Sequence, residues 1–388
     1  MRKAVVTVLA VGDVAPMTFS PQWANVVAKI RGSQSIFVNV QDFLRQGDIV
    51  FCQLEIPISA RARWSLPQAR RSDHGDPRTA RLIKEAGFNV VSFASNHCMD
   101  WGPEVMFDTV EALEREGIKV VGVGKDIWEA RKPVTFEVKG VKIGFLAYNS
   151  ILPMGYWAEE NRPGCAPLRA FTLYEPIEHD QPGTPCRIRT FPCPEDLRNA
   201  VDDVISLKAR VDIVIVSLHW GIHFVPAVLA EYQRTVAYAL IDAGADLILG
   251  HHAHILKPIE FYKGVAIFYS LGNFATDLPF SEEQIKDKSF REIQSLNPTW
   301  LPSPDVLYNC PTDSEKTVIV CCGLTKSGII NISIRPVWID RKTACPELLT
   351  ATDPRFFEVV NYLCDICRAV GLEFRYKVDG DNVLLWEK

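Results

Sequence analysis

Short apolar runs that end abruptly in polar residues recur along this sequence and predict buried strands. The clearest of these runs cover residues 5–11, 48–52, 89–93, 211–217 and 246–249. Between them, apolar residues recur at helical spacing over 35–46, 79–86, 103–113, 195–209 and 227–243. Because strands and helices alternate, the pattern predicts a two-layer α/β sandwich, and its polar strand ends predict one functional cluster at the rim.

Two stretches interrupt this regular pattern. Prolines accumulate over 153–194 and periodicity fades, which predicts a long loop or lid. Residues 278–316 predict a second irregular insertion. We therefore expect a core domain over 1–277 that carries the lid. Residues 317–388, with strands at 317–321 and 329–339, a helix at 354–370 and a strand pair within 373–386, should complete the same domain.

Five of the predicted strand ends bear residues that bind metals or move protons. They are Asp13, Glu55, Asn96-His97, His219 and the His251–His254 run. Active sites of α/β proteins gather at the carboxyl ends of strands, so these residues are predicted to meet. For each one taken alone, a turn residue or a helix cap is the competing interpretation.

The stretch from Ala245 to Phe274 is the richest in such chemistry. Alternate residues of a short extended segment point the same way, so His252 and His254 are predicted to converge while His251 faces elsewhere. Two neutral imidazoles aimed at one point can hold a transition metal or share an acid/base task. Asn273, after the next strand, can orient one of them through its amide. A polar turn with solvated histidines is the alternative.

Composition narrows the class of protein. The chain has 388 residues, 47% of them apolar, and a net charge of −5, so no large basic face for nucleic acid is expected. The first apolar run is too short to span a bilayer and lacks a cleavage site, which predicts a cytoplasmic protein without a membrane span. Eleven cysteines, an odd number, fit mostly reduced thiols.

Six arginines lie in the loop 61–81, including Arg61 and Arg63. Arginine forks suit recognition of carboxylates and phosphates, so this loop is a candidate substrate-binding segment. A solvated loop is the alternative. No P-loop, GxGxxG motif or repeat is found in the sequence.

Taken in order, the polar motifs resemble those of the bacterial capsule-synthesis CapA-like family, which is similar to calcineurin-like metallophosphoesterases. The matching motifs are Gly12-Asp13, Leu54-Glu55, Asn96-His97 with Asp100-Trp101-Gly102, His219-Trp220-Gly221, Gly250-His251-His252-Ala253-His254 and Tyr269-Ser270-Leu271-Gly272-Asn273-Phe274. The match covers roughly residues 4–277 and the strands after 317.

The resemblance implies a four-layer α-β-β-α sandwich with a site for two divalent metal ions, such as Mn, Fe or Zn. It implies His97 as an acid beside the metals and Trp220 and Asn273 as residues near the substrate. The metal ligands that it implies are Asp13, Glu55, Asn96, His219, His252 and His254. Family members are linked to poly-γ-glutamate capsule formation or breakdown and are usually membrane-tethered.

The sequence departs from this pattern at four points. Ala15 stands where metallophosphoesterases have a histidine, Gln53 replaces an asparagine, and His223 replaces an acid. The usual N-terminal anchor is missing. The first three departures predict incomplete metal loading, and the fourth predicts an intracellular role.

Three functions remain open. The first is a metal-dependent hydrolase of a peptide-like amide, such as a γ-glutamyl bond, or of a phosphate ester, with His97 or His219 protonating the leaving group. The second is a metal-free acid/base enzyme that uses Asp13, Glu55 and the histidines, such as a peptide epimerase in a ribosomal (lasso-type) peptide pathway. The third is a non-catalytic subunit of poly-γ-glutamate synthesis. The expected partner is a peptide or a small anionic substrate.

Overall fold

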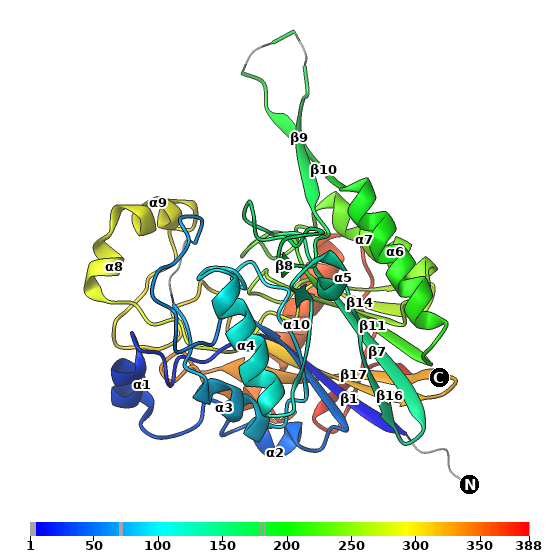
Figure 1. Cartoon of the computed structure of the whole chain (residues 1–388), viewed down its shortest axis with the longest axis horizontal. Coiled ribbons are helices and arrows are strands. Elements are labelled where there is room, and N and C mark those ends of the chain that lie inside the picture. Colours follow the sequence, from blue (N-terminus) through cyan, green and yellow to red (C-terminus); the bar gives the residue numbers. More distant parts are fainter. Residues whose placement is uncertain (1–4, 70–72, 179, 182, 388) are drawn as a thin grey trace.

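Two β-sheets packed face to face form the centre of the molecule (Figure 1). The computed structural model describes residues 5–69, 73–178, 180–181 and 183–387. In the larger sheet the strands run in the order β19-β20-β17-β16-β1-β2-β3-β4, with β15 also pairing β1 and β18 pairing β17. In the smaller sheet the order is β13-β14-β12-β11-β7-β6. Strands β1 to β4 are parallel to one another, as are β7, β11, β12 and β14.

The strands of the larger sheet are β1 (Val6–Ala15), β2 (Ile49–Leu54), β3 (Val90–Ser92), β4 (Lys119–Val121), β15 (Asn273–Thr276), β16 (Lys316–Thr325), β17 (Gly328–Ile339), β18 (Pro346–Leu348), β19 (Lys377–Asp379) and β20 (Asn382–Glu387). Those of the smaller sheet are β6 (Val134–Val138), β7 (Val141–Asn149), β11 (Ile213–His219), β12 (Leu247–His251), β13 (Ile259–Tyr262) and β14 (Val265–Phe268). Two further pairs are β5 (Val123–Gly124) with β8 (Gly164–Cys165), and β9 (Ala170–Pro176) with β10 (Cys186–Pro192).

The helices are α1 (Ala24–Arg31), α2 (Gln41–Leu44), α3 (Arg78–Ala86), α4 (Pro103–Arg115), α5 (Ile127–Ala130), α6 (Pro194–Lys208), α7 (Glu231–Asp242), α8 (Glu282–Lys286), α9 (Lys288–Leu296) and α10 (Pro354–Ala369). Helix α4 begins with a proline at its first position, where the missing N–H costs no hydrogen bond.

Three apolar cores hold the layers together. The strand β1 shows why, because Val8 and Ala10 pack between the two sheets while Leu9 and Val11 pack on the helices α1 to α4. A third core joins the smaller sheet to α6 and α7. The order of layers is therefore helices, sheet, sheet, helices, which confirms the four-layer α-β-β-α sandwich that the resemblance implies. The two layers predicted from the pattern alone are wrong, because apolar runs do not show that the strands divide between two sheets.

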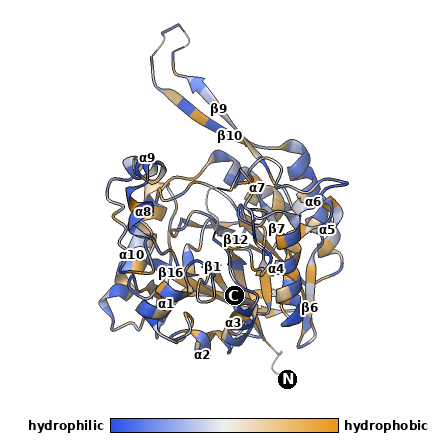
Figure 2. Cartoon of the chain, turned by 60° about the vertical axis from the view of Figure 1, so that its left-hand side comes forward, coloured by the Kyte–Doolittle hydropathy of each residue, from blue (hydrophilic) through white to orange (hydrophobic). Residues whose placement is uncertain are grey.

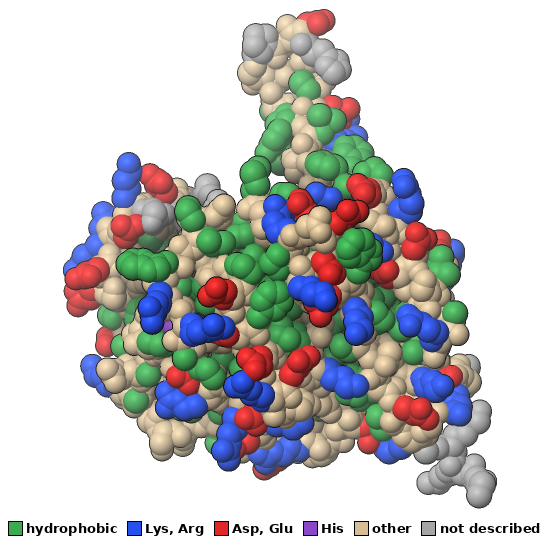
Figure 3. Space-filling model, in the orientation of Figure 1, with side chains coloured by type: hydrophobic (Ala, Val, Ile, Leu, Met, Phe, Trp, Pro, Cys, Tyr) green, Lys and Arg blue, Asp and Glu red, His purple; other side chains and the backbone are tan. Residues whose placement is uncertain are grey.

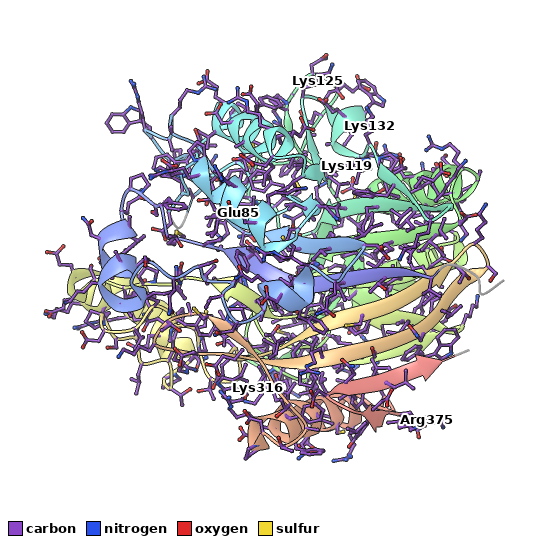
Figure 4. All side chains as sticks on the ribbon, turned by 90° about the horizontal axis from the view of Figure 1, so that it is seen from below. Glu85, Lys119, Lys125, Lys132, Lys316 and Arg375 are labelled. Atoms are coloured by element: carbon purple, nitrogen blue, oxygen red, sulfur yellow. The ribbon has the colours of Figure 1, made fainter. Side chains whose placement is uncertain are left out.

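Helix α10 closes one open side of this sandwich. Its residues Phe356, Val360 and Leu363 belong to the core between the sheets, and the helix contacts β17 of one sheet and β13 of the other. In the view from below, the labelled Lys316 and Arg375 lie on this side, while Lys119, Lys125 and Lys132 lie on the opposite side (Figure 4).

Three predictions about elements are wrong in part. The predicted helix over 35–46 is reduced to α2, because turns occupy most of 36–40. The predicted loop 153–194 contains the β9–β10 hairpin, which projects from the body of the molecule (Figure 1). The insertion 278–316 contains α8 and α9. Both stretches escaped prediction because their apolar residues do not face a core with the usual period.

Within the described part of the chain, no helix combines the length and apolar character needed to cross a membrane.

Candidate functional site

The carboxyl ends of the parallel strands bring the predicted site residues to one rim. Strand β1 delivers Asp13, β11 delivers His219 and β12 delivers His251. The strand ends approach so closely that a Cβ on Gly12 would collide with the carbonyl oxygen of Gly272. The missing side chain lets the Asp13 amide donate to that same oxygen at 2.9 Å. Glycine is therefore required here by close backbone approach.

Asp13, Glu55 and His219 form the centre of the cluster. Their candidate ligand atoms all lie within 4.8 Å of one another, and all three side chains are buried. The Nδ1 of His219 is 3.1 Å from Oε1 of Glu55. Both of these atoms, and Oδ1 of Asp13, are buried without a hydrogen-bond partner. Buried polar atoms are almost always paired, so three unpaired acceptor-type atoms around one point are the arrangement that a cation satisfies.

The other nitrogen of His219, Nε2, lies beside a second group of polar atoms. Its Nε2 lies 2.7 Å from Oδ1 of Asn96 and 3.1 Å from Nδ1 of His252. Nδ1 of His252 also lies 3.3 Å from the same Asn96 oxygen. His219 thus stands between Asp13 and Glu55 on one side and Asn96 and His252 on the other.

The 251–254 segment is not extended, which corrects the geometry expected for it. His252 has φ 85° and His254 has φ 56°, so the chain turns in the left-handed region at both residues. As a result all three histidines reach Asp13. Nδ1 of His251 lies 3.3 Å from Oδ1, while the His252 amide donates to Oδ2 and Nδ1 of His254 lies 3.4 Å from it.

His251 is the site residue that sequence reasoning missed, since it was expected to face away. It is fully buried, and neither ring nitrogen has a hydrogen-bond partner. Strands β11 and β12 pair with His219 opposite His251. Residues paired across parallel strands share a face, so this register was the signal that could have found it.

His97 lies beside the cluster and is held by a carboxylate. Its Nδ1 is 2.7 Å from Oδ2 of Asp100, and the hydroxyl of Tyr156 donates to Oδ1 of the same carboxylate at 3.0 Å. The His97 side chain is 25% exposed, whereas that of Asp100 is 3% exposed. The pair lines a small pocket together with Glu55 and His254. His97 and His254 are therefore the described histidines of the cluster that open to this pocket.

Burial sets the protonation of the central residues. Burial, reinforced by the negative charge of Asp13, raises the pKa of the Glu55 carboxyl well above its ordinary value. Burial, reinforced by the neighbouring histidines, lowers the pKa of His219 and of His252 well below the ordinary value. Without a cation the cluster thus favours a protonated Glu55 and neutral imidazoles. Neutral imidazole is the form that binds metals.

Aromatic rings lie against the site histidines, and one of these rings comes from the 278–316 segment. The ring of His223 lies 3.8 Å from that of His252, and Phe224 stacks on His254 at 5.6 Å. Trp300, from the 278–316 segment, lies 5.8 Å from Phe224. The segment that the sequence left without a role therefore packs against the site.

Two of the four predicted substrate-binding residues are misassigned. Trp220 is fully buried, donates its indole N–H to the Tyr269 carbonyl and stacks on the Tyr269 ring, so it is a core residue. Asn273 is also fully buried and its amide is engaged by protein groups on both sides, so no part of it faces a substrate.

Three of the four described arginines of the 61–81 loop form ion pairs. The Arg61 guanidinium forms an ion pair with Asp108 of α4, and Arg63 is exposed. Arg78 and Arg81 pair with Asp76 and Glu85. Arg70 and Arg71 lie outside the described residues. A role for Arg61 and Arg63 in substrate binding stays a prediction.

A family model matches residues 7–278, and its description is "Bacterial capsule synthesis protein PGA_cap". The chain is 31% identical to "PGA biosynthesis protein CapA" of Bacillus subtilis (strain 168), over 66% of this chain and 60% of that protein. It is 29% identical to "Capsule biosynthesis protein CapA" of Bacillus anthracis, over 63% of this chain and 54% of that protein. The chain thus spans little more than half the length of these relatives.

Solved structures show a weaker likeness. A hypothetical protein from Thermus thermophilus has a TM-score of 0.41 and 16% identity, and the match covers 85% of this chain and 98% of that one. The calcineurin-like phosphoesterase YfkN from Bacillus subtilis has a TM-score of 0.37 and 12% identity, and the match covers 95% of this chain and 96% of that one. These scores are low, and the fold described above rests on the layers and strand order of this chain.

Proposed function

Because the chain belongs to the bacterial capsule synthesis family PGA_cap, and because its strand ends form a buried cluster of metal-ligand side chains, we propose that it is a metal-dependent hydrolase. The observation that carries this proposal is the set of unpaired atoms on Asp13, Glu55 and His219 around one point. An apolar or purely structural role would leave no reason for three such atoms to be buried without partners.

The residues fit one divalent ion directly and offer donors toward a second. Asp13, Glu55 and Nδ1 of His219 would hold the first, and Asn96 and His252 lie on the other side of the His219 ring. An ion bound there supplies Lewis-acid activation of water and of the bond to be cleaved. Carboxylate and imidazole donors suit Mn, Fe or Zn.

His97 is the residue that we assign to proton transfer. Asp100 accepts from Nδ1, so a protonated His97 presents its remaining N–H from Nε2. Tyr156 donates to the second oxygen of Asp100 and so holds that carboxylate in place against the His97 ring. The partly exposed ring lines the pocket beside Glu55, where a leaving group can accept its proton.

The substrate that we propose is a peptide-like amide, with a γ-glutamyl bond as the first choice, or a phosphate ester. The first choice follows from two relatives whose names give biosynthesis of PGA or of capsule. The pocket walls combine apolar Met17, Ile56 and Leu278 with carboxylates. Because Arg31 already pairs with the buried Asp277, an anionic substrate would depend on the bound cation for charge balance.

Hydrolysis of γ-glutamyl-p-nitroanilide and p-nitrophenyl phosphate by the metal-reloaded full chain tests this proposal. His97→Gln should lower kcat about 10²- to 10⁴-fold while leaving metal affinity unchanged. Asp42→Asn, at a side chain that is 90% exposed, should leave both unchanged. Turnover that is absent, or equal in the wild type and His97→Gln, would contradict the assignment.

One observation favours a second candidate, the metal-free acid/base enzyme. The pKa of Glu55 is raised and the pKa of His219 is lowered, which favours a protonated acid beside a neutral base. Such a pair suits proton exchange at a peptide α-carbon. Deuterium uptake from solvent into a peptide by metal-stripped protein would support this candidate, and uptake only after metal addition would exclude it.

A further inference from the structure

A buried chain of hydrogen bonds runs from the 278–316 segment to the histidine run. The Tyr308 hydroxyl donates to the carbonyl oxygen of Ser314 at 2.6 Å. The amide nitrogen of Asn273 donates to the Tyr308 oxygen at 2.9 Å and to Sγ of Cys310 at 3.3 Å. The amide oxygen of Asn273 lies 2.8 Å from Nδ1 of His254. Asn273, Tyr308 and Ser314 are all fully buried.

The direction of each hydrogen bond follows from the first acceptor. A backbone carbonyl can only accept, so the single proton of the Tyr308 hydroxyl points at Ser314. The Tyr308 oxygen must then accept, and only the NH₂ end of the Asn273 amide can donate to it. Burial raises the pKa of Tyr308 well above its ordinary value, so the phenol keeps its proton.

The orientation of the Asn273 amide decides the protons on His254. With its NH₂ end toward Tyr308, the amide presents its carbonyl oxygen to His254, and Nδ1 of that ring must carry the hydrogen. In a neutral imidazole the lone pair then lies on Nε2. Turning the amide over would leave the buried Ser314 carbonyl without its donor, at a cost of about 1–3 kcal/mol.

From this chain of donors we propose that Tyr308, acting through Asn273, fixes His254 as the Nδ1–H tautomer, which leaves Nε2 as the nitrogen that could bind a metal. Tyr308 and Asn273 are then positioning residues. The tautomer stands on the hydrogen bonds alone, whereas its use in metal binding rests on the proposed function. Asp13 Oδ2 also lies 3.4 Å from Nδ1, a distance too long for a strong hydrogen bond.

The consequence is a role for the segment over 278–316. Tyr308 is held in turn by the end of β17, since its amide donates to the Arg341 carbonyl at 3.0 Å. Partners that orient a ligand histidine typically change metal affinity about 10- to 100-fold when removed. The 278–316 segment is therefore expected to influence the metal affinity of the site, because it fixes the tautomer of the His254 ring.

The direct test is the nitrogen spectrum of His254 in ¹⁵N-histidine-labelled, metal-stripped full chain at neutral pH, assigned by comparison with His254→Gln. The wild type should show a protonated Nδ1 and an unprotonated Nε2. Tyr308→Phe, which removes only the hydroxyl, should give a mixture of tautomers. Tyr238→Phe, which removes a hydroxyl bonded to Glu260 instead, should match the wild type.

Titration with Mn²⁺ then separates this inference from the proposed function. Tyr308→Phe should bind Mn²⁺ about 10- to 100-fold more weakly. Its melting temperature should fall by only a few degrees, because the Ser314 carbonyl loses its donor while the fold is kept. A wild-type protein that has the Nδ1–H tautomer but binds no Mn²⁺ would refute the metal-dependent function and leave the tautomer assignment standing. A wild-type Nε2–H tautomer, or a Tyr308→Phe spectrum identical to the wild type, would overturn the inference.

Discussion

Asp13 is the residue around which the site is built. Its two carboxylate oxygens are approached by groups of three residues of the 251–254 turn, and its backbone is fixed by Gly272 and by the Thr276 hydroxyl. A buried carboxylate so close to several imidazoles, with one oxygen left without a hydrogen bond, is an arrangement that a cation would satisfy.

Glu55 gives a test of the electrostatics of this residue cluster. The pKa of the Glu55 carboxyl is raised in the folded protein. Between the ordinary carboxyl range near pH 4 and this higher folded pKa, the folded protein therefore binds a proton that the unfolded chain has released. The free energy of unfolding of metal-free protein should therefore fall as the pH rises through this interval.

Glu55→Gln removes that titration. In chelator, the variant should be more stable than the wild type at pH 7 by on the order of 1–3 kcal/mol, and the difference should vanish near pH 4. Urea unfolding measures both, with the exposed Glu85→Gln as the control. A variant that is no more stable than the wild type at pH 7 would contradict the raised pKa.

Gly12 tests the close approach of the strands. In Gly12→Ala the new methyl group would meet the backbone of Gly272, so the strand end must shift. We expect a loss of about 1–3 kcal/mol of stability together with loss of metal binding. Gly380→Ala, at a position with open space but with φ 58°, should cost about 1–2 kcal/mol and keep metal binding. Thermal unfolding and Mn²⁺ titration distinguish the two.

Site residues could be predicted from the sequence where a strand ends in a polar side chain, as at Asp13, Glu55 and His219. The direction in which a side chain points could not be predicted. His251 was expected to face away because the segment was taken as extended, and the positive φ of His252 and His254 cannot be seen in the sequence. Trp220 follows a site residue in the chain but points into the core, as alternation along a strand end allows.

Among the elements, the β9–β10 hairpin stands apart. It projects from the body with Phe171, Leu173 and Phe191 on one of its faces, between 50% and 57% exposed (Figure 3). Figure 2 shows apolar residues along its length. At its base Arg189 forms an ion pair with Glu231 of α7, and an exposed pair of this kind contributes about 0–1 kcal/mol.

Replacing residues 171–191 by Asn-Gly therefore tests whether the hairpin is separate from the site. Ala170 and Pro192 are already paired, so a two-residue turn can join them. We expect a melting temperature within a few degrees of the wild type and unchanged Mn²⁺ affinity. Arg189→Ala alone should account for part of any loss. A collapse of the fold, or loss of metal binding, would show that the hairpin supports the site.

The hairpin also shows the limit of prediction at this scale. Regular buried strands, such as β3 and β11, were predicted nearly to their ends because apolar residues mark them. The hairpin has no buried face, so its sequence shows no clear alternation and resembled a loop. The helices α8 and α9 were missed for the same reason, since they lie in an insertion away from the main cores.

At the scale of the whole molecule, the site depends on two sheets meeting at one rim. Asp13 and Glu55 come from the larger sheet, whereas His219 and the 251–254 turn come from the smaller one. The resemblance of the motifs predicted the order of layers better than the periodicity of apolar residues did. An apolar run predicts a strand but does not show which sheet that strand joins. Joining the sheets thus assembles the cluster.

Equilibrium metal binding to the stripped full chain tests the central claim most directly. The wild type should bind at least one equivalent of Mn, Fe or Zn, and Asp13→Asn, which keeps the shape of the side chain, should weaken binding at least about 100-fold. Asp42→Asn should bind like the wild type. A wild type that binds no metal, or an Asp13→Asn variant that binds it equally well, would contradict the account.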